Sequence, residues 1–254
     1  MPLFDHHVHT DRSDGTKSLA DRAASTKVRP HGVSDHFPWK QKMRTDDDVL
    51  RYVDEASSIG LRVGLEYDLG VAPALRATTR DALHYLIGSI HQIEITPGEW
   101  IEFDTAGAYL KGRTKTFSRA AEFVDAGLQG RIRERTLEEV RRGIERDGID
   151  IVGHATMGPL AAVGDPEKMY PPEWQERLIR LCVENDVAIE VNECYALPHR
   201  AFLERAHALG ARFSVGTDSH FSIGPLDKTM AMIRGEGLDE ARFLAGARVR
   251  PVRG

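Results

Sequence analysis

Nine side chains that can bind metal ions recur along the chain, each close to the point where an apolar, strand-like run gives way to a polar loop. Imidazole nitrogens and carboxylate oxygens together are donors that proteins use for zinc, iron and manganese. One such residue after a strand is unremarkable, but a repeat after six strand-like runs predicts that several strand ends converge on one multinuclear metal site. The nine residues are His7, His9, Asp14, His36, Glu66, His91, His154, Asp218 and His220.

Two short spacings place potential ligands on the same face of the chain. His7 and His9 are separated by one residue, so in an extended strand both imidazoles point the same way. Asp218 and His220 repeat this geometry with a carboxylate and an imidazole. Glu66 is the only acidic residue at the end of its strand-like run, and its two oxygens can bridge two metal ions. The polar loop of residues 10–15 can return Asp14 to the same cluster.

Strand-like and helical segments alternate along the chain, which predicts a mostly parallel sheet covered by helices. Potential ligands follow six of the seven predicted strands, and catalytic residues of closed α/β barrels lie at the carboxyl ends of strands. We therefore predict an α/β fold, a distorted (β/α)7 TIM-like barrel with parallel strands. The strands are predicted near residues 3–7, 32–35, 62–66, 85–91, 150–154, 187–192 and 212–218.

Helix boundaries are marked by capping residues. Thr45 is a suitable N-cap for a helix over residues 46–59, which opens with three aspartates where the helix dipole favours negative charge. Thr136 followed by Glu139 predicts a capping box for a helix over residues 137–146 that stops at Gly148. Two further helices are predicted after Pro171 and over residues 199–209.

Length and composition fit one soluble barrel domain over residues 1–254. The long segment 92–149 between the fourth and fifth strands is predicted to be a lid or substrate loop, or else an extra helix pair with a solvated basic face.

The formal net charge of −5 argues against a membrane surface or long nucleic acid as partner. No apolar run approaches the roughly 20 residues that span a bilayer. We expect no cleavable leader, and free thiols at Cys182 and Cys194 in a reducing cytoplasm.

The motifs taken in order resemble the polymerase-and-histidinol-phosphatase (PHP) superfamily, from Phe4 to about Leu226. The resemblance implies a distorted seven-stranded barrel with a trinuclear metal site, holding two to three divalent ions. Zinc, iron and manganese are all compatible with the donors. The motifs are His7-x-His9-x4-Asp14-Gly15, Ser34-Asp35-His36, Gly64-Leu65-Glu66, Gly88-Ser89-Ile90-His91, Gly153-His154 and Gly216-Thr217-Asp218-Ser219-His220.

The resemblance also implies how the ligands divide among three metals. The first would be held by His7, His9, Glu66 and Asp218. The second would share Glu66 with His91 and His154. The third would be held by Asp14, His36 and His220. Some relatives have a histidine where this chain has Asp14. The resemblance therefore implies a difference in the metal preference or occupancy of the third site.

The chain looks most like the histidinol-phosphate phosphatase branch, with one departure. Members of that branch usually continue the motif at Asn192 as Asn-Thr-Ser-Gly, whereas this chain reads Asn-Glu-Cys-Tyr-Ala over residues 192–196. A changed loop at the open end of a barrel alters substrate contacts more readily than metal binding. The resemblance therefore predicts the reaction class more firmly than the substrate.

The implied reaction is phosphomonoester hydrolysis by a metal-bound hydroxide, in which metals lower the pKa of a water and neutralise phosphate oxygens. The predicted catalytic residues are Asp14, Glu66, Asp218 and His220, with Asp14 a candidate proton donor to the leaving group. Positive charge around the phosphate is also required. Candidate substrate contacts are Arg12, Lys17, Arg44, Arg113, Lys115, His199 and Arg200.

The predicted partner is a small phosphorylated metabolite, with L-histidinol phosphate, cleaved to histidinol and phosphate in histidine biosynthesis, the foremost candidate. One alternative is a nucleotide phosphatase or phosphodiesterase of the same superfamily. A metal-dependent amidohydrolase and a non-catalytic metal-binding module are further alternatives. No particular oligomeric state is predicted.

Overall fold

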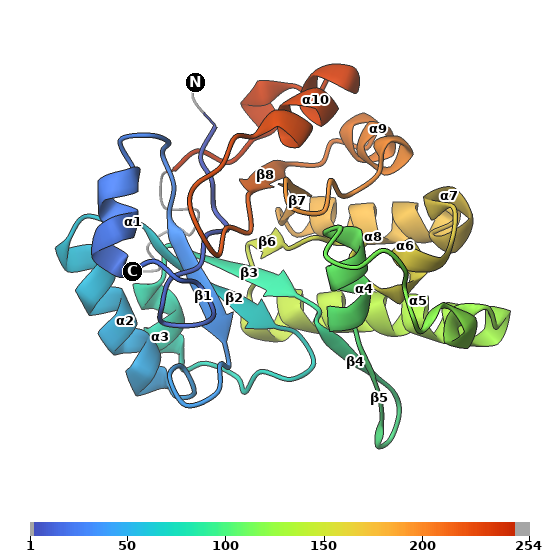
Figure 1. Ribbon diagram of the computed structural model, residues 1–254, viewed down its shortest axis with the longest axis horizontal. Helices are drawn as coiled ribbons and strands as arrows, with labels where there is room; N and C mark the ends of the chain where they lie inside the picture. Colours follow the sequence, from blue (N-terminus) through green and yellow to red (C-terminus); the bar gives the residue numbers. More distant parts are fainter. Residues whose placement is uncertain (1–2, 247–254) are drawn as a thin grey trace.

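Six parallel strands form a curled sheet in the computed structural model, which describes residues 3–246 (Figure 1). The strands follow the order β1-β2-β3-β6-β7-β8, and every neighbouring pair is parallel. All six were predicted from the sequence to within a few residues. Their bounds are β1 Val33–Phe37, β2 Val63–Asp68, β3 Tyr85–Ser89, β6 Ile151–Val152, β7 Ala188–Asn192 and β8 Phe213–Gly216.

The seventh predicted strand, residues 3–7, is not a regular strand. Asp5 forms isolated bridges with His31 and Val215, and Val8 forms one with Ser219, so this segment lies between the two edges of the sheet. The Asp5 carboxylate accepts hydrogen bonds from Thr217 N at 3.0 Å and Thr217 Oγ1 at 2.6 Å. Because this buried side chain takes donors that would otherwise serve a strand ladder, regular pairing stops. The result is a half-barrel closed by an irregular segment, which agrees with the predicted distorted barrel.

Helices cover the outer face of the sheet (Figure 1). Helix α2 begins as predicted: Thr45 Oγ1 accepts from Asp48 N at 3.2 Å, and Asp48 accepts from Thr45 N at 2.9 Å. The helices after Pro171 and near residue 200 are also present. The bounds outside the long insertion are α1 Leu19–Ser25, α2 Asp46–Ser58, α3 Ala77–Ala82, α6 Pro159–Val163, α7 Pro166–Met169, α8 Pro172–Glu184, α9 Arg200–Ala208, α10 Asp227–Gly235 and η3 Glu240–Arg242.

The segment between β3 and β6 folds into a hairpin followed by helices. The hairpin projects from the body of the molecule, and α4 follows it next to the carboxyl end of the sheet (Figure 1). The elements are β4 Gln92–Thr96, β5 Glu99–Glu102, α4 Asp104–Leu110, η1 Ala120–Phe123, α5 Ala126–Arg142 and the π-helical turn η2 Gly143–Asp147.

One predicted helix start in this segment is wrong. Helix α5 begins eleven residues before the predicted start at residue 137, with Asp125 as N-cap accepting from Leu128 N at 2.7 Å. Thr136 lies inside the helix, where its hydroxyl donates to Ile132 O at 2.8 Å, so the predicted capping box does not form. The helical stretch does stop at Gly148, which adopts the left-handed conformation with φ of 65°.

The curl of the sheet separates two apolar cores. A large one lies between the sheet and the helices. A small one fills the inside of the curl below the strand ends and consists of Tyr85, Ile87, Ile151, Ala188 and Leu244. Because aromatic and aliphatic side chains fill the interior at that level, polar side chains two residues further along the strands stand above a closed floor.

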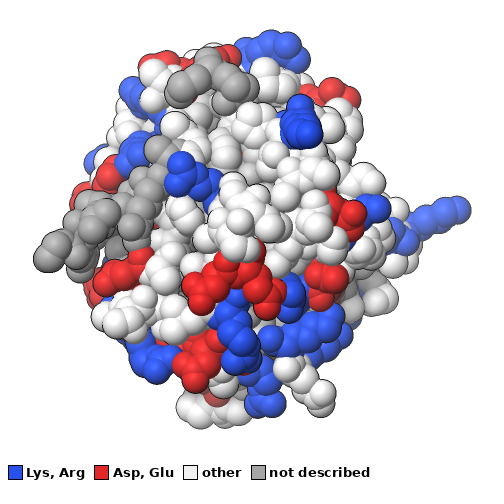
Figure 2. Space-filling view, turned by 90° about the vertical axis from the view of Figure 1, so that its left-hand side faces the viewer, with Lys and Arg blue, Asp and Glu red and all other residues white. Residues whose placement is uncertain are grey.

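Acidic and basic side chains lie next to one another on the lower part of the face shown in Figure 2, rather than forming a surface of one sign. Side chains of opposite charge also pair around α2: Arg51 contacts Asp48, and Arg76 contacts Asp46 and Asp47. Among residues 3–246, no helix combines the length and the apolar character needed to span a membrane.

The contact between Gly64 and Tyr85 yields a test of the inner core. A Cβ at Gly64 would lie 2.2 Å from the Tyr85 ring, which is buried. We expect Gly64→Ala to lower the free energy of unfolding by about 1–3 kcal/mol, the usual cost of overpacking, measured by urea denaturation. Gly224→Ala, where no atom lies within 4 Å of the added carbon, should change it little. Equal stability of both variants would contradict a rigid inner core.

Candidate metal centre

Glu66, on β2, is the centre of the polar cluster at the carboxyl ends of the strands. Its Oε1 atom lies 2.9 Å from His154 Nε2 and 3.2 Å from His91 Nε2. Its Oε2 atom faces three other rings: His36 Nδ1 at 3.0 Å, His7 Nε2 at 3.2 Å and His9 Nε2 at 3.4 Å. The two oxygens therefore address two separate groups of imidazoles, which is the arrangement a bridging carboxylate requires.

Two aspartates complete the cluster on the side of the N-terminal loop and β8. Asp14 Oδ2 lies 2.9 Å from His220 Nε2, and Asp14 Oδ1 lies 3.5 Å from His9 Nδ1. Asp218 Oδ1 lies 3.3 Å from His9 Nε2 and 3.4 Å from His220 Nδ1. All nine residues predicted as ligands are thus brought together, although they come from seven separate segments of the chain.

The potential donor atoms form three overlapping groups. One contains His7, His9 and Glu66, and another contains His36, Glu66 and His91. The third is His9, Asp14, His36 and His220. This division agrees only in part with the one implied by the sequence motifs. His9 and His36 each belong to two groups, and Asp218 and His154, which the motifs assign to the first and second metals, belong to none.

Outer side chains fix the orientation of two of the rings. His7 Nδ1 lies 2.7 Å from Glu190 Oε1, and His91 Nδ1 lies 3.5 Å from Asp68 Oδ1. A carboxylate at the far nitrogen turns the other nitrogen, Nε2, towards the metal position and raises its basicity. Neither carboxylate was assigned a role from the sequence. For Glu190 the available signal was a charged residue between the apolar residues Ile189 and Val191 of a predicted strand.

The cluster has the properties of a metal site rather than a self-sufficient hydrogen-bond network. His7 Nε2, His9 Nε2 and Glu66 Oε2 are buried and have no hydrogen-bond partner, although buried polar atoms are normally satisfied. The backbones of His154 and Asp218 adopt positive φ values of 25° and 52°, which non-glycine residues rarely do. Metal ions would satisfy the three atoms, and backbone strain of this kind is concentrated at functional sites.

Opposite charges within the cluster shift its pKa values in opposite directions. Burial by itself would raise the pKa of Glu66, but nearby His7 and His36 outweigh it and hold the pKa well below its usual range. Burial likewise opposes protonation of His36, yet Glu66 and Asp14 raise its pKa to about 9. For His9 burial dominates and lowers the pKa to about 4. At neutral pH, metal binding would therefore displace a proton from His36 but not from His9.

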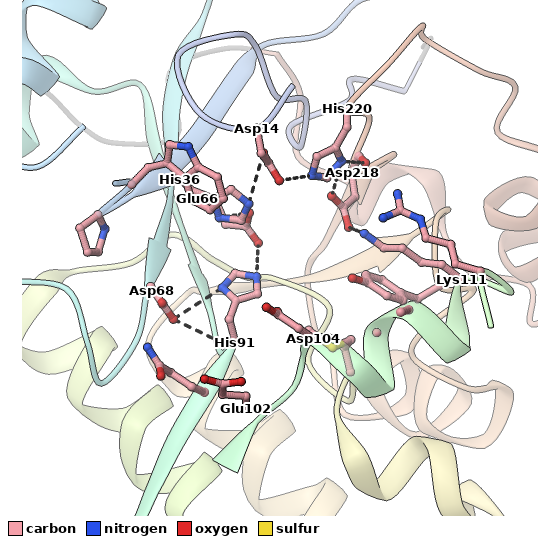
Figure 3. Close-up of a pocket in the computed structure, with 18 residues that line it drawn as sticks. Asp14, His36, Glu66, Asp68, His91, Glu102, Asp104, Lys111, Asp218 and His220 are labelled. Carbon is pink, nitrogen blue, oxygen red and sulfur yellow. Dashed lines mark hydrogen bonds and ion pairs between the residues drawn. The ribbon is translucent and has the colours of Figure 1, made fainter. Parts of the chain in front are cut away.

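A cleft of about 350 Å³ opens onto the cluster, and its walls carry opposite charges (Figure 3). Lys111 and Arg113, just after α4, line one wall; Lys111 Nζ lies 3.3 Å from Asp218 Oδ2 and 4.5 Å from the centre of the Tyr195 ring. Three labelled carboxylates lie around His91 in the figure: Asp68 to its left, Glu102 below it and Asp104 to its right. Lys111 belongs to the basic run Lys111, Arg113, Lys115 and Arg119, of which Arg113 and Lys115 but not Lys111 were predicted from the sequence to contact substrate.

The changed loop after Asn192 reaches this cleft. Tyr195 lines it and packs edge-on against His154, with ring centres 5.5 Å apart. Asn192 Oδ1 accepts from Tyr195 N at 3.0 Å and so holds the loop in place. The departure from the family motif therefore falls on the wall of the cleft.

The residues predicted to contact substrate are not all near the cleft. Arg113 lines it, and Arg44 lines an adjoining cavity that shares Asp14 and Trp39 with it. Three others are engaged with acidic residues elsewhere: Arg12 with Glu55, His199 with Glu167, and Arg200 with Glu204 and Glu236. Lys17 and Lys115 do not line either cavity.

Removal of the bridging carboxylate tests the centre. We expect Glu66→Ala to lower Zn²⁺ affinity at least about 100-fold, beyond the cost of losing an outer partner, because both imidazole groups lose their shared ligand. His154→Ala should lower the affinity only for Zn²⁺ held on the Oε1 side of Glu66. Calorimetric Zn²⁺ titration of the metal-free protein measures both effects, with circular dichroism as the check on folding. Glu99→Ala, an exposed substitution on β5, serves as control, and wild-type affinity in Glu66→Ala would contradict the site.

Comparison with known proteins supports the fold and identifies the family. Histidinol phosphate phosphatase from Lactococcus lactis subsp. lactis, solved in complex with zinc, L-histidinol and phosphate, has a similar structure with a TM-score of 0.61. The two are 13% identical, and the alignment covers 98% of this chain and 97% of that one. No curated protein sequence matches. The family model of the PHP domain matches residues 5–194, three quarters of the chain, and the chain therefore belongs to the PHP domain family.

Proposed function

We propose that this protein is a metal-dependent phosphatase that hydrolyses the phosphomonoester of a small metabolite. The observation that carries the proposal is the placement of Glu66, whose two oxygens face two different groups of histidine nitrogens at 2.9–3.4 Å. Two or three divalent ions held there would lower the pKa of a water molecule and neutralise phosphate oxygens. Zinc, iron and manganese all suit this mixture of imidazole and carboxylate donors.

The ligand roles fall to the nine predicted residues. Among the four predicted catalytic residues, Glu66, Asp218 and His220 would act by holding the ions at the reacting phosphate. Asp14 would do the same and would not protonate the leaving group. Burial alone would raise its pKa, but His220 and His36 hold the pKa well below its usual range, so the carboxylate stays ionised.

Lys111 and Arg113 would bind the phosphate. Both line the cleft beside Asp218, and the Lys111 side chain is only 13% exposed, so its charge is poorly screened by water. Positive charge placed where the transferring group gains negative charge stabilises the transition state. The insertion between β3 and β6 would therefore supply the phosphate-binding cations, and the barrel would supply the ligands.

L-Histidinol phosphate is the foremost substrate candidate, which would place the enzyme in histidine biosynthesis. The similar L. lactis phosphatase was solved with L-histidinol and phosphate. The charges of the cleft are also complementary to such a molecule: Lys111 and Arg113 suit the phosphate, and the carboxylates of Asp68, Glu102 and Asp104 suit an ammonium group. The cleft volume of about 350 Å³ suits a small ligand.

A nucleotide phosphatase is the second candidate, and the adjoining cavity favours it. That cavity, of about 720 Å³, is lined by Trp39, Lys40, Lys42 and Arg44 and meets the metal cluster at Asp14. An aromatic ring and three cations would suit the base and further phosphates of a nucleotide.

Phosphate release from a panel of esters decides between these substrates. The panel contains histidinol phosphate, nucleoside monophosphates and sugar phosphates, each assayed with Mn²⁺, Zn²⁺ and Fe²⁺. We expect turnover of at least one monoester, with histidinol phosphate the best. Preference for a nucleotide would favour the second candidate. If no ester is cleaved with any metal while an amide substrate is, the chain is an amidohydrolase instead.

The role of Lys111 is tested by its replacement with a neutral side chain. We expect Lys111→Met to lower kcat/KM about 100-fold, as for other groups that stabilise transition-state charge, and to weaken inhibition by inorganic phosphate. Lys115→Met removes an exposed lysine of the same run and should leave both values unchanged. Steady-state kinetics and metal analysis measure the effects. Reduced metal content in Lys111→Met would instead show that the lysine supports Asp218.

A further inference from the structure

We propose that Glu190, on β7, is a positioning residue that sets the metal affinity of the centre by holding two ligands, His7 and His154, at the same time. Nothing in the ligand motifs assigns it a role, and it does not line the cleft. Its side chain is fully buried, at 0% exposure. The proposal rests on the metal centre of the proposed function and is independent of the substrate.

One oxygen of Glu190 fixes the His7 ring. Glu190 Oε1 lies 2.7 Å from His7 Nδ1, and the opposite ring nitrogen, Nε2, lies 3.2 Å from Glu66 Oε2. A carboxylate only accepts hydrogen bonds, so Nδ1 must carry the proton, and Nε2 keeps its lone pair for a metal. His7 Nε2 is one of the buried atoms without a hydrogen-bond partner, as this role requires.

The other oxygen fixes the main chain of His154. Glu190 Oε2 accepts from His154 N at 2.6 Å and from Asn192 Nδ2 at 3.0 Å. His154 has the unusual positive φ of 25°, and its Nε2 atom lies 2.9 Å from Glu66 Oε1. The hydrogen bond from its main chain thus holds a strained backbone that directs the ring towards the other oxygen of Glu66.

The neighbouring strand is built to admit this carboxylate. A Cβ at Gly216, on β8, would lie 1.9 Å from Glu190 Oε1 and 2.8 Å from His7 Cβ. Only glycine therefore leaves room for the contact between Glu190 and His7. Glu190 thus supports His7, which faces one oxygen of Glu66, and His154, which faces the other.

The geometry predicts a specific defect for Glu190→Gln. Two donors, His154 N and the Asn192 amide, face Oε2, so the amide oxygen of glutamine must take that place. Its NH2 group then faces His7 Nδ1 and donates to it, which moves the ring proton to Nε2 and blocks metal binding there. Glu190→Asp keeps the acceptors but is one methylene shorter, so it cannot reach both ligands.

The test is calorimetric titration of metal-free protein with Zn²⁺, together with circular dichroism and thermal melting of the metal-free forms. We expect Glu190→Gln to weaken Zn²⁺ binding about 10–100-fold, the range for loss of an outer-shell partner, with the fold retained. Glu193→Gln is the matched control. That residue accepts from Lys228 N and Thr229 N and touches no ligand, so its Zn²⁺ affinity should equal that of the wild type.

The outcomes separate positioning from a purely structural role. Wild-type Zn²⁺ affinity in a folded Glu190→Gln protein overturns the proposal. If Glu190→Gln does not fold, Glu190→Asp decides, because weakened Zn²⁺ binding at unchanged melting temperature supports positioning and unchanged binding overturns it. Nitrogen chemical shifts of ¹⁵N-labelled histidine in the Zn²⁺-saturated proteins give a second measure, since only positioning changes the protonated nitrogen of His7. Failure of wild-type protein to bind Zn²⁺ would reject the metal centre itself.

Discussion

A carboxylate taken out of water loses several kcal/mol of solvation unless opposite charge replaces the water. Glu66 is 1% exposed and is surrounded by five imidazoles rather than by lysine or arginine. Imidazoles serve either as cations when protonated or as metal ligands when neutral, so the same shell suits the carboxylate in both states. Because the imidazoles compensate the charge of Glu66 both with and without metal, several charged groups can be buried together here. The other residues of the site are arranged around Glu66.

The curled sheet brings that shell together. Parallel strands all point their carboxyl ends to one edge, and the curl turns the edge from a line into a ring. Closure depends on the segment around Asp5, where a buried carboxylate bonds to Thr217 and interrupts regular pairing. Because this segment is not held in a regular ladder, its backbone can place His7 and His9 above the apolar floor formed by Tyr85 and its neighbours.

The convergence of the nine candidate ligands could be predicted from sequence because each lies close to the end of an apolar run, and parallel strands end at one edge of the sheet. Glu190 and Asp68 could not be found in this way, since what they do depends on which ring nitrogen faces them in three dimensions. The helix start predicted at Thr136 was wrong for a related reason. Thr136 and Glu139 have the spacing of a capping box, but Asp125 caps a longer helix whose buried side, including Ile132, extends further towards the N-terminus. Local signals predict what is possible, and packing selects among the possibilities.

The proposed metal ligands and most of the charged wall residues of the cleft come from different parts of the chain. All nine proposed ligands come from the barrel strands and the loops that directly follow them. In contrast Glu102, Asp104, Lys111 and Arg113, which together with Asp68 of β2 give the cleft its charged walls, all belong to the insertion of residues 92–149. Because the insertion packs beside the barrel without supplying a proposed ligand, its charges can change while the metal geometry stays fixed. The proposed preference for an ester that carries an amine therefore rests on the side chains of the cleft walls and not on the metal ligands.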